Sequence, residues 1–130
     1  MNEKPIKPLN WVGSSYRDYK RFPEPVQEEM GFALYRAQIG DRHPMAKALK
    51  GFGGAGVLEL VERHDGDAYR TVYTVKFAEE VYVLHAFQKK SKKGIATPKS
   101  ETDLVKRRLK EAEEDYHGRH RTTGEKPKSR

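Results

Sequence analysis

Three strand-like segments joined by two short turns occupy residues 57–90, and this arrangement constrains the fold more than any other feature of the chain. The first two segments, VLELVER and AYRTVYTVKF, flank Asp65 and Gly66. An Asp-Gly pair readily adopts the positive φ angles of a tight hairpin turn. Residues 78–80 form a second short turn before VYVLHAFQKK. The sequence therefore predicts an antiparallel meander whose last strand, apolar on both faces, lies centrally in the sheet.

Helical periodicity is found on both sides of this meander. Segment 22–40 repeats apolar residues at helical spacing, with Pro25 near its first turn and Gly40 just past its end, which predicts an amphipathic helix. A shorter helix is expected over 43–51, because its apolar residues share one face and a glycine is placed to cap it. A final helix is expected over 97–116, which begins with helix-start residues and carries an apolar stripe.

The predicted fold class is α+β. The segment PLNWV at residues 8–12 adds a first strand, so the element order is β-α-α-β-β-β-α, with helices packed on one face of an antiparallel sheet. A chain of 130 residues suffices for one core, and we expect a single domain over residues 1–116. Residues 117–130 are polar, basic and without periodicity, so we expect them to form a disordered tail.

Basic residues are concentrated in two places along the chain. The whole sequence has 26 Lys and Arg against 19 Asp and Glu, a net charge of +7. Residues 117–130 hold five of the basic residues against one glutamate, or +4, and residues 85–100 hold five lysines and no carboxylate. Such a patch favours an anionic partner, and nucleic acid more than a small anionic substrate, although solubility alone also explains basic charge.

Several classes of protein are excluded or disfavoured by composition. The chain has no cysteine, so disulfides and thiolate metal sites are excluded, which fits a reducing cytosol. The longest nearly apolar run, Val81–Phe87, is far shorter than the roughly 20 residues that cross a bilayer. The opening MNEKPIKPLNW lacks the apolar core of a signal peptide. We therefore expect a cytoplasmic protein without a membrane partner.

Alternation along the meander strands predicts one polar, cationic sheet face. Glu59, Arg63, Arg70 and His85 are expected on this face, which leads to the lysine run and includes an aromatic ring. Cations that hold phosphates beside a ring that stacks a base are typical of single-stranded RNA binding. The candidate RNA-binding residues are Arg63, Lys76, Phe87, Lys92 and Lys93. The alternative is an ordinary solvated sheet face with ion pairs such as Glu59 with Arg63.

The segment GVLELVERHDGDAYRTVYTVKFAEEVYVLHAFQKKSKKGIATP, preceded by HPMAKALKGF and a helix, resembles a known family. It is similar to the RelE/HigB-like toxins of type II toxin–antitoxin systems, in the branch of phage-derived or phage-related proteins. The similarity covers Trp11–Tyr116. It rests on the order and spacing of LKGFGGAGVLEL, YRTVYTV and VYVLHAFQKKSKKGIATP rather than on any single motif.

The resemblance implies a RelE-like domain that cleaves mRNA on the translating ribosome, with a helix-turn-helix antitoxin of the XRE/HigA-like type as its partner. In that family the 2′-hydroxyl attacks the adjacent phosphate, so neither metal nor cofactor is required. The reaction needs a group that accepts the hydroxyl proton, cations that stabilise the phosphorane, and an acid for the leaving 5′-oxygen.

The resemblance also suggests catalytic residues. Arg70 matches the arginine that relatives use near the phosphate, and Lys89 and Lys90 correspond to the basic pair after the last strand, as electrostatic stabilisers or as the acid. His85 is a candidate base because the pKa of a histidine lies near neutrality, and the alternative is a buried strand histidine.

The sequence departs from the family at two places. Val61 stands where many relatives carry a basic residue, and Arg63 on the same face is expected to replace it; no tyrosine follows the lysine run. These departures leave the base and the acid open. They also leave open a noncatalytic RNA- or ribosome-binding module that uses the same groove, and a phage accessory protein of unrelated role.

Overall fold

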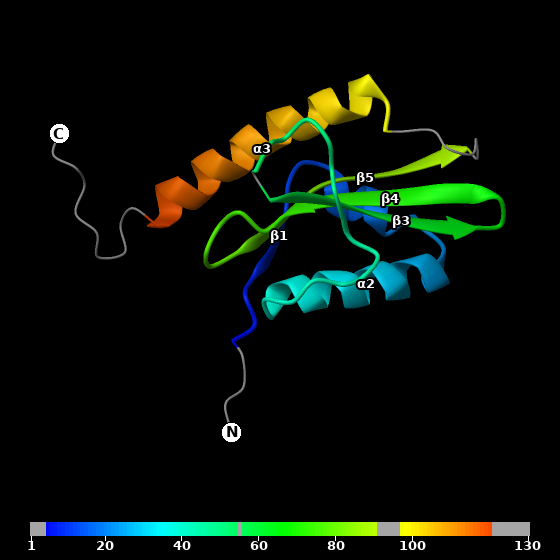
Figure 1. The fold of residues 1–130 in the computed structure, drawn as a ribbon, viewed down its shortest axis with the longest axis horizontal. Helices are drawn as coiled ribbons and strands as arrows, with labels where there is room; N and C mark the ends of the chain where they lie inside the picture. Colours follow the sequence, from blue (N-terminus) through cyan, green and yellow to red (C-terminus); the bar gives the residue numbers. More distant parts are fainter. Residues whose placement is uncertain (1–4, 55, 91–96, 121–130) are drawn as a thin grey trace, which may run out of the picture.

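The computed structural model describes residues 5–54, 56–90 and 97–120 (Figure 1). Its elements are β1 (Leu9–Trp11), α1 (Ser15–Tyr19), α2 (Glu24–Gln38), β2 (Lys47–Ala48), β3 (Val57–His64), β4 (Asp67–Thr74), β5 (Val81–Lys90) and α3 (Lys99–His120). The helix expected over 22–40 and the final helix are both present as α2 and α3. An α+β fold is therefore confirmed.

The described strands form one sheet in the order β1-β5-β4-β3-β2. The predicted meander β3-β4-β5 is antiparallel, and Asp65 and Gly66 form its first turn with φ angles of 50° and 85°. β5 is an interior strand, as its apolar character on both faces predicted. The sheet is mixed rather than wholly antiparallel, because β1 pairs in parallel with β5 after a long connection that contains α1, α2 and three further strands.

Helices cover both faces of the sheet, so the prediction that they pack on one face is wrong (Figure 1). One core lies between the sheet and α1–α2 and includes Val81 and Val83 of β5. The second core lies between the sheet and α3 and includes Tyr82 and Leu84. The alternating apolar residues of β5 contribute to both cores. Each apolar face of the sheet is removed from water only when a helix packs on it.

In the first half of the chain one local prediction is wrong and one element was missed. Residues 43–51 are not helical: Lys47–Ala48 form the short edge strand β2, which pairs with β3. A few apolar residues at helical spacing do not distinguish a short helix from an irregular strand, and the β3 edge supplies the backbone partners that decide it. The five-residue helix α1 was not predicted at all.

The last helix continues beyond its predicted end. α3 runs to His120, so residues 117–120 of the predicted tail are helical, and residues 121–130 lie outside the described part of the chain. The apolar stripe ends at Tyr116, but polar contacts made by Arg119 and His120 extend the ordered helix by another turn.

A bulge in β5 changes which side chains face α3. Val72 pairs with His85, and Tyr73 pairs with Val83, so Leu84 is the extra residue in β5. A bulge of this kind reverses the alternation of the residues that follow it. Leu84 and His85 consequently both face α3, and the bulge brings His85 onto the same side as Arg70.

Candidate functional site

Three rows of side chains cross β3, β4 and β5 on the sheet face that α3 partly covers. Residues paired in the strand register share a face, and neighbouring strands lie about 4.8 Å apart. The rows are Glu59–Val72–His85, Val61–Arg70–Phe87 and Arg63–Ala68–Lys89. The face predicted from strand alternation therefore brings Arg63, Arg70, His85 and Phe87 together, with Lys89 in the row beyond.

The Arg70 guanidinium is held in a compact polar cluster. Its Nη1 donates to Oε2 of Glu59 at 3.1 Å and to Oγ1 of Thr97 at 3.2 Å. The Thr97 hydroxyl donates to the same Glu59 oxygen at 2.6 Å. Arg70 is only 8% exposed, so the expected open groove is closed at this point by Thr97, which lies two positions before α3. A phosphate that reaches Arg70 has to displace Thr97.

The imidazole of His85 is enclosed between α3 and the sheet. Its Nε2 lies 2.6 Å from Oε1 of Glu101, and its ring stacks on Phe87 with centroids 4.7 Å apart. Its Nδ1 is buried and has no hydrogen-bond partner among the described residues. A carboxylate only accepts hydrogen bonds, so Nε2 carries the proton, and a second N–H at the enclosed Nδ1 would be unsatisfied. This geometry suits the buried-histidine alternative.

The predicted cations differ in their placement. Arg63 is exposed, and Lys89 is half-buried in the same row. The backbone of Lys90 pairs with Asp67, whereas Lys92 and Lys93 lie outside the described residues. Lys76 lies beyond the opposite end of β4 and forms an ion pair with Glu113 of α3 at 2.6 Å.

A cleft of about 300 Å³ lies at the edge of β5, beside His85 and Phe87. β1 pairs only with residues 81–83 of β5, and α1 packs beside the strand farther along. The cleft is lined by Asp18 and Arg21 of the α1 region, by His85 and Phe87 of β5, and by Glu101 of α3. It is a concave surface with both aromatic and charged walls next to Arg70.

One family model matches most of the domain just described. It is the model of Phage derived protein Gp49-like (DUF891), and it covers residues 17–110. The chain belongs to this family. The match confirms the expected phage-derived branch.

Two solved structures are similar to this Gp49-like protein. A double mutant of the E. coli toxin RelE in the free state is 15% identical, with a TM-score of 0.52 over 82% of this chain and 97% of that chain. The isolated E. coli RelE toxin is 20% identical, with a TM-score of 0.50 over 78% of this chain and 97% of that chain. These matches show the RelE fold. No curated protein matches the sequence significantly.

Three residues of the Gp49-like site were not found from the sequence. Thr97 and Glu101 reach the site only because α3 lies across this sheet face, and Arg21 reaches it through the unpredicted helix α1. The threonine was recognised as a helix-start residue. Its contact with Arg70 spans 27 positions and has no local signal.

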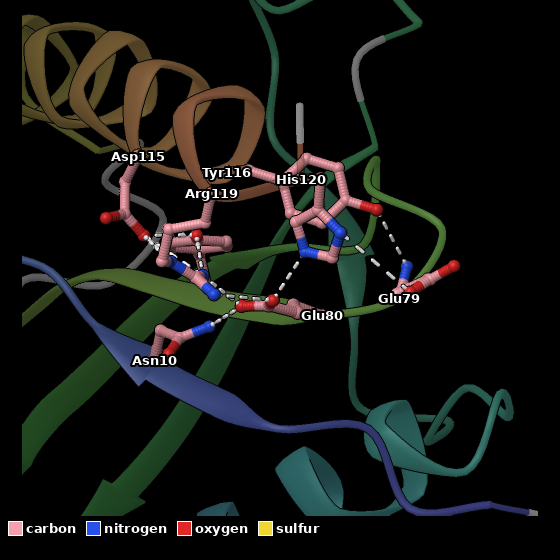
Figure 2. A network of polar contacts seen from close by, with 8 residues as sticks. Asn10, Glu79, Glu80, Asp115, Tyr116, Arg119 and His120 are labelled. Atoms are coloured by element: carbon pink, nitrogen blue, oxygen red, sulfur yellow. Dashed lines mark hydrogen bonds and ion pairs between the residues drawn. The ribbon is translucent and has the colours of Figure 1, made fainter. Parts of the chain in front are cut away.

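A second polar network holds the other end of α3 on the sheet (Figure 2). The buried carboxylate of Glu80 accepts hydrogen bonds from Asn10 Nδ2 at 2.6 Å and Arg119 Nη1 at 3.0 Å, and His120 Nε2 lies 2.7 Å away. These contacts, led by Arg119, lower the pKa of Glu80 to about 2. The helix is thus fixed at both ends, by Glu80 and by the Arg70 cluster.

Within residues 5–54, 56–90 and 97–120, no helix combines the length and apolar character needed to cross a bilayer.

Proposed function

We propose that this Gp49-like protein is the toxin of a type II toxin–antitoxin pair and acts as a ribosome-dependent mRNA endoribonuclease. The family and the RelE fold support this proposal. The observation that carries it is the placement of Arg70 in one row with Phe87, beside the row of Arg63 and Lys89. This arrangement offers an oriented guanidinium, a ring and two further cations to one stretch of RNA.

The proposed reaction is the attack of an RNA 2′-hydroxyl on the adjacent phosphorus, which releases the 5′-oxygen and forms a cyclic phosphate. Arg70 stabilises the negative charge of the phosphorane, assisted by Lys89 and Lys90, one of which donates the proton to the leaving oxygen. His85 accepts the hydroxyl proton only after it leaves Glu101 and takes the other tautomer, because Nε2 donates to Glu101 in the present conformation.

The proposed partners follow the charge of this face. Ribosome-bound mRNA reaches Arg70 by displacing the Thr97 hydroxyl, and exposed Arg63 contacts the neighbouring backbone. A helix-turn-helix antitoxin of the XRE/HigA-like type inactivates the toxin by covering the same basic face, most directly with an acidic segment. The protein works in the cytoplasm, where its substrate is translated.

A noncatalytic RNA- or ribosome-binding module is the second candidate function. It is favoured by the pairing of Arg70 with Glu59 and by the enclosure of His85. In that case the same residues hold phosphates and no bond is broken.

Induction of the gene, followed by primer extension on cellular transcripts, tests the proposal. Wild-type protein should stop growth and produce transcript ends inside codons, and co-expression of a neighbouring helix-turn-helix protein should prevent both. The double variant Arg70→Gln with Glu59→Gln removes the guanidinium without leaving a buried charge unpaired, and should lose cleavage while remaining folded. Arg107→Ala removes an exposed arginine of α3 as a control. Ribosome binding without new transcript ends would establish the noncatalytic module instead.

A further inference from the structure

The cleft at the edge of β5 has walls of distinct chemistry. Phe87 supplies an aromatic wall, Glu101 supplies a carboxylate from the first turn of α3, and Asp18 and Arg21 supply one charge of each sign from the α1 side. The volume of about 300 Å³ lies at the lower end of the range of small-ligand sites. The cleft therefore suits a compact, planar, polar group better than an extended chain.

The Glu101 carboxylate is fixed in direction. One of its oxygens is held by His85 Nε2 at 2.6 Å, and the buried imidazole is itself stacked on Phe87. The Glu101 side chain is 31% exposed, so it is accessible from the cleft while its position is set from behind. A carboxylate held in this way accepts hydrogen bonds from a ligand without first losing side-chain entropy.

The charges on the cleft walls favour a neutral ligand with N–H donors. The cleft is lined by two carboxylates, Asp18 and Glu101, and by one guanidinium, Arg21, and this balance of charge disfavours a phosphate as the main ligand. Unstacked RNA bases are neutral and planar, and proteins recognise them by stacking and by hydrogen bonds to their edges. Guanine presents two neighbouring N–H donors to a carboxylate, whereas uracil presents one N–H between two carbonyl oxygens, which a carboxylate repels.

We propose that this cleft binds one unstacked nucleobase of the RNA substrate, with guanine preferred over uracil. Phe87 stacks the base, Glu101 reads its donor edge, and Arg21 contacts the adjoining backbone. This inference rests on the proposed RNA function and adds a specificity site to it. Phe87 is opposite Arg70 in the strand register, so the bound base belongs to a nucleotide next to the phosphate at Arg70.

Two measurements test the cleft separately from cleavage. In the first, GMP, UMP and ribose 5-phosphate are titrated into the full chain and followed by amide chemical shifts. GMP should shift the amide resonances of residues 18–22 and 85–88. It should bind at least about tenfold more tightly than UMP, as other bidentate base contacts do. In the second, the protein is given ribosomes that carry mRNAs with either G or U at one position, and this position is varied along the codon. The rates of mRNA cleavage are then compared between G and U.

Variants with matched controls identify the residues that read the base. Glu101→Gln should reduce the preference for GMP over UMP to within about twofold, because the amide presents both a donor and an acceptor. Asp103→Asn removes an exposed carboxylate from the same helical turn and should preserve the preference. Arg21→Ala should weaken GMP and UMP equally, whereas Arg17→Ala, whose side chain is 69% exposed, should change neither.

The outcomes separate the cleft from the proposed function. Equal binding of GMP and UMP, with equal cleavage at G and U, overturns the specificity site and leaves the nuclease standing. A GMP preference that Glu101→Gln abolishes, in a protein that cleaves no mRNA, supports the cleft and overturns the nuclease. Equal shifts with ribose 5-phosphate show that the cleft binds phosphate, and this also overturns the inference.

Discussion

Arg70 and Glu59 form a mostly buried ion pair across β4 and β3, with Nη1 3.1 Å from Oε2 and side chains that are 10% and 12% exposed. Removing one member of such a pair leaves a desolvated charge, so Glu59→Gln and Arg70→Gln should each lower the free energy of unfolding by about 3 kcal/mol. The double variant should lose clearly less than the sum of the two. Urea unfolding of the four proteins measures the coupling, and additive losses would show that the pair contributes nothing as a unit.

Thr97 is predicted to stabilise the protein and to limit access to Arg70 at the same time. Its hydroxyl bonds both Glu59 and Arg70. Thr97→Val should reduce the free energy of unfolding by about 1 kcal/mol, the usual contribution of such a hydrogen bond. It should also tighten the binding of single-stranded RNA, because phosphate no longer competes with the hydroxyl. Fluorescence anisotropy with a labelled oligonucleotide measures the second effect; Thr102→Val, with its exposed hydroxyl on α3, is the control.

Glu80 should make the protein sensitive to acid. Its pKa falls from 4.5 to about 2 in the folded state, because Arg119, His120 and Asn10 bind its charged form. A group whose pKa is depressed by folding stabilises the protein above its unfolded pKa and loses this contribution as pH falls. The stability from Glu80 should therefore be present at neutral pH and decline between about pH 5 and pH 2.

The Glu80→Gln variant tests this dependence. It should unfold with about 2–3 kcal/mol less free energy at pH 7, with a smaller difference from wild type near pH 2. The matched control is Glu79→Gln, which removes the neighbouring carboxylate whose side chain is 69% exposed. Thermal and urea unfolding from pH 7 to pH 2 measure both variants. A constant difference between Glu80→Gln and wild type across this range would contradict the assignment.

Sequence patterns predicted the parts of the fold that depend on neighbours in the chain. The Asp65-Gly66 turn has a local conformational cause, and the apolar repeat of α2 is long enough to specify a helix. α1 and β2 have five and two residues, too few for a period. The bulge at Leu84 depends on pairing between β4 and β5, and without it simple alternation would point His85 toward α2.

The candidate site was predictable to the same extent. Strand alternation and the local Asp65-Gly66 turn placed Arg70 and Arg63 on one face. The side that Phe87 faces depends, like that of His85, on the bulge at Leu84. The packing of α3 on that face could not be predicted. Both faces of the sheet are partly apolar, and which of them α3 covers depends on tertiary contacts. The presence of Glu101 and Thr97 in the site was therefore not predicted, and the expected open groove is partly closed.

The end of the domain provides a further prediction. A chain that ends at Tyr116 lacks Arg119 and His120, so Glu80 would be left buried with Asn10 as its only partner among those shown in Figure 2. Removing the cation from a buried pair costs about 3–5 kcal/mol. The 1–116 chain should thus be much less stable than the 1–120 chain, which should match the full chain. Equal melting temperatures for all three would place the domain boundary at Tyr116.

Exposed Arg63 and half-buried Lys89 should set the salt dependence of RNA binding. Each lysine or arginine that neutralises a phosphate releases counterions, so the logarithm of the binding constant falls with the logarithm of salt concentration by about 0.7 per contact for single strands. Arg63→Ala and Lys89→Ala should each reduce this slope by about that amount and weaken binding to every sequence alike. Lys47→Ala, on the edge strand farthest from β5, should leave the slope unchanged. Phe87 and the cleft are expected to contact bases rather than phosphates. Phe87→Leu should therefore weaken RNA binding at every salt concentration and leave the slope unchanged. A changed slope would show that the ring acts by arranging the cations beside it.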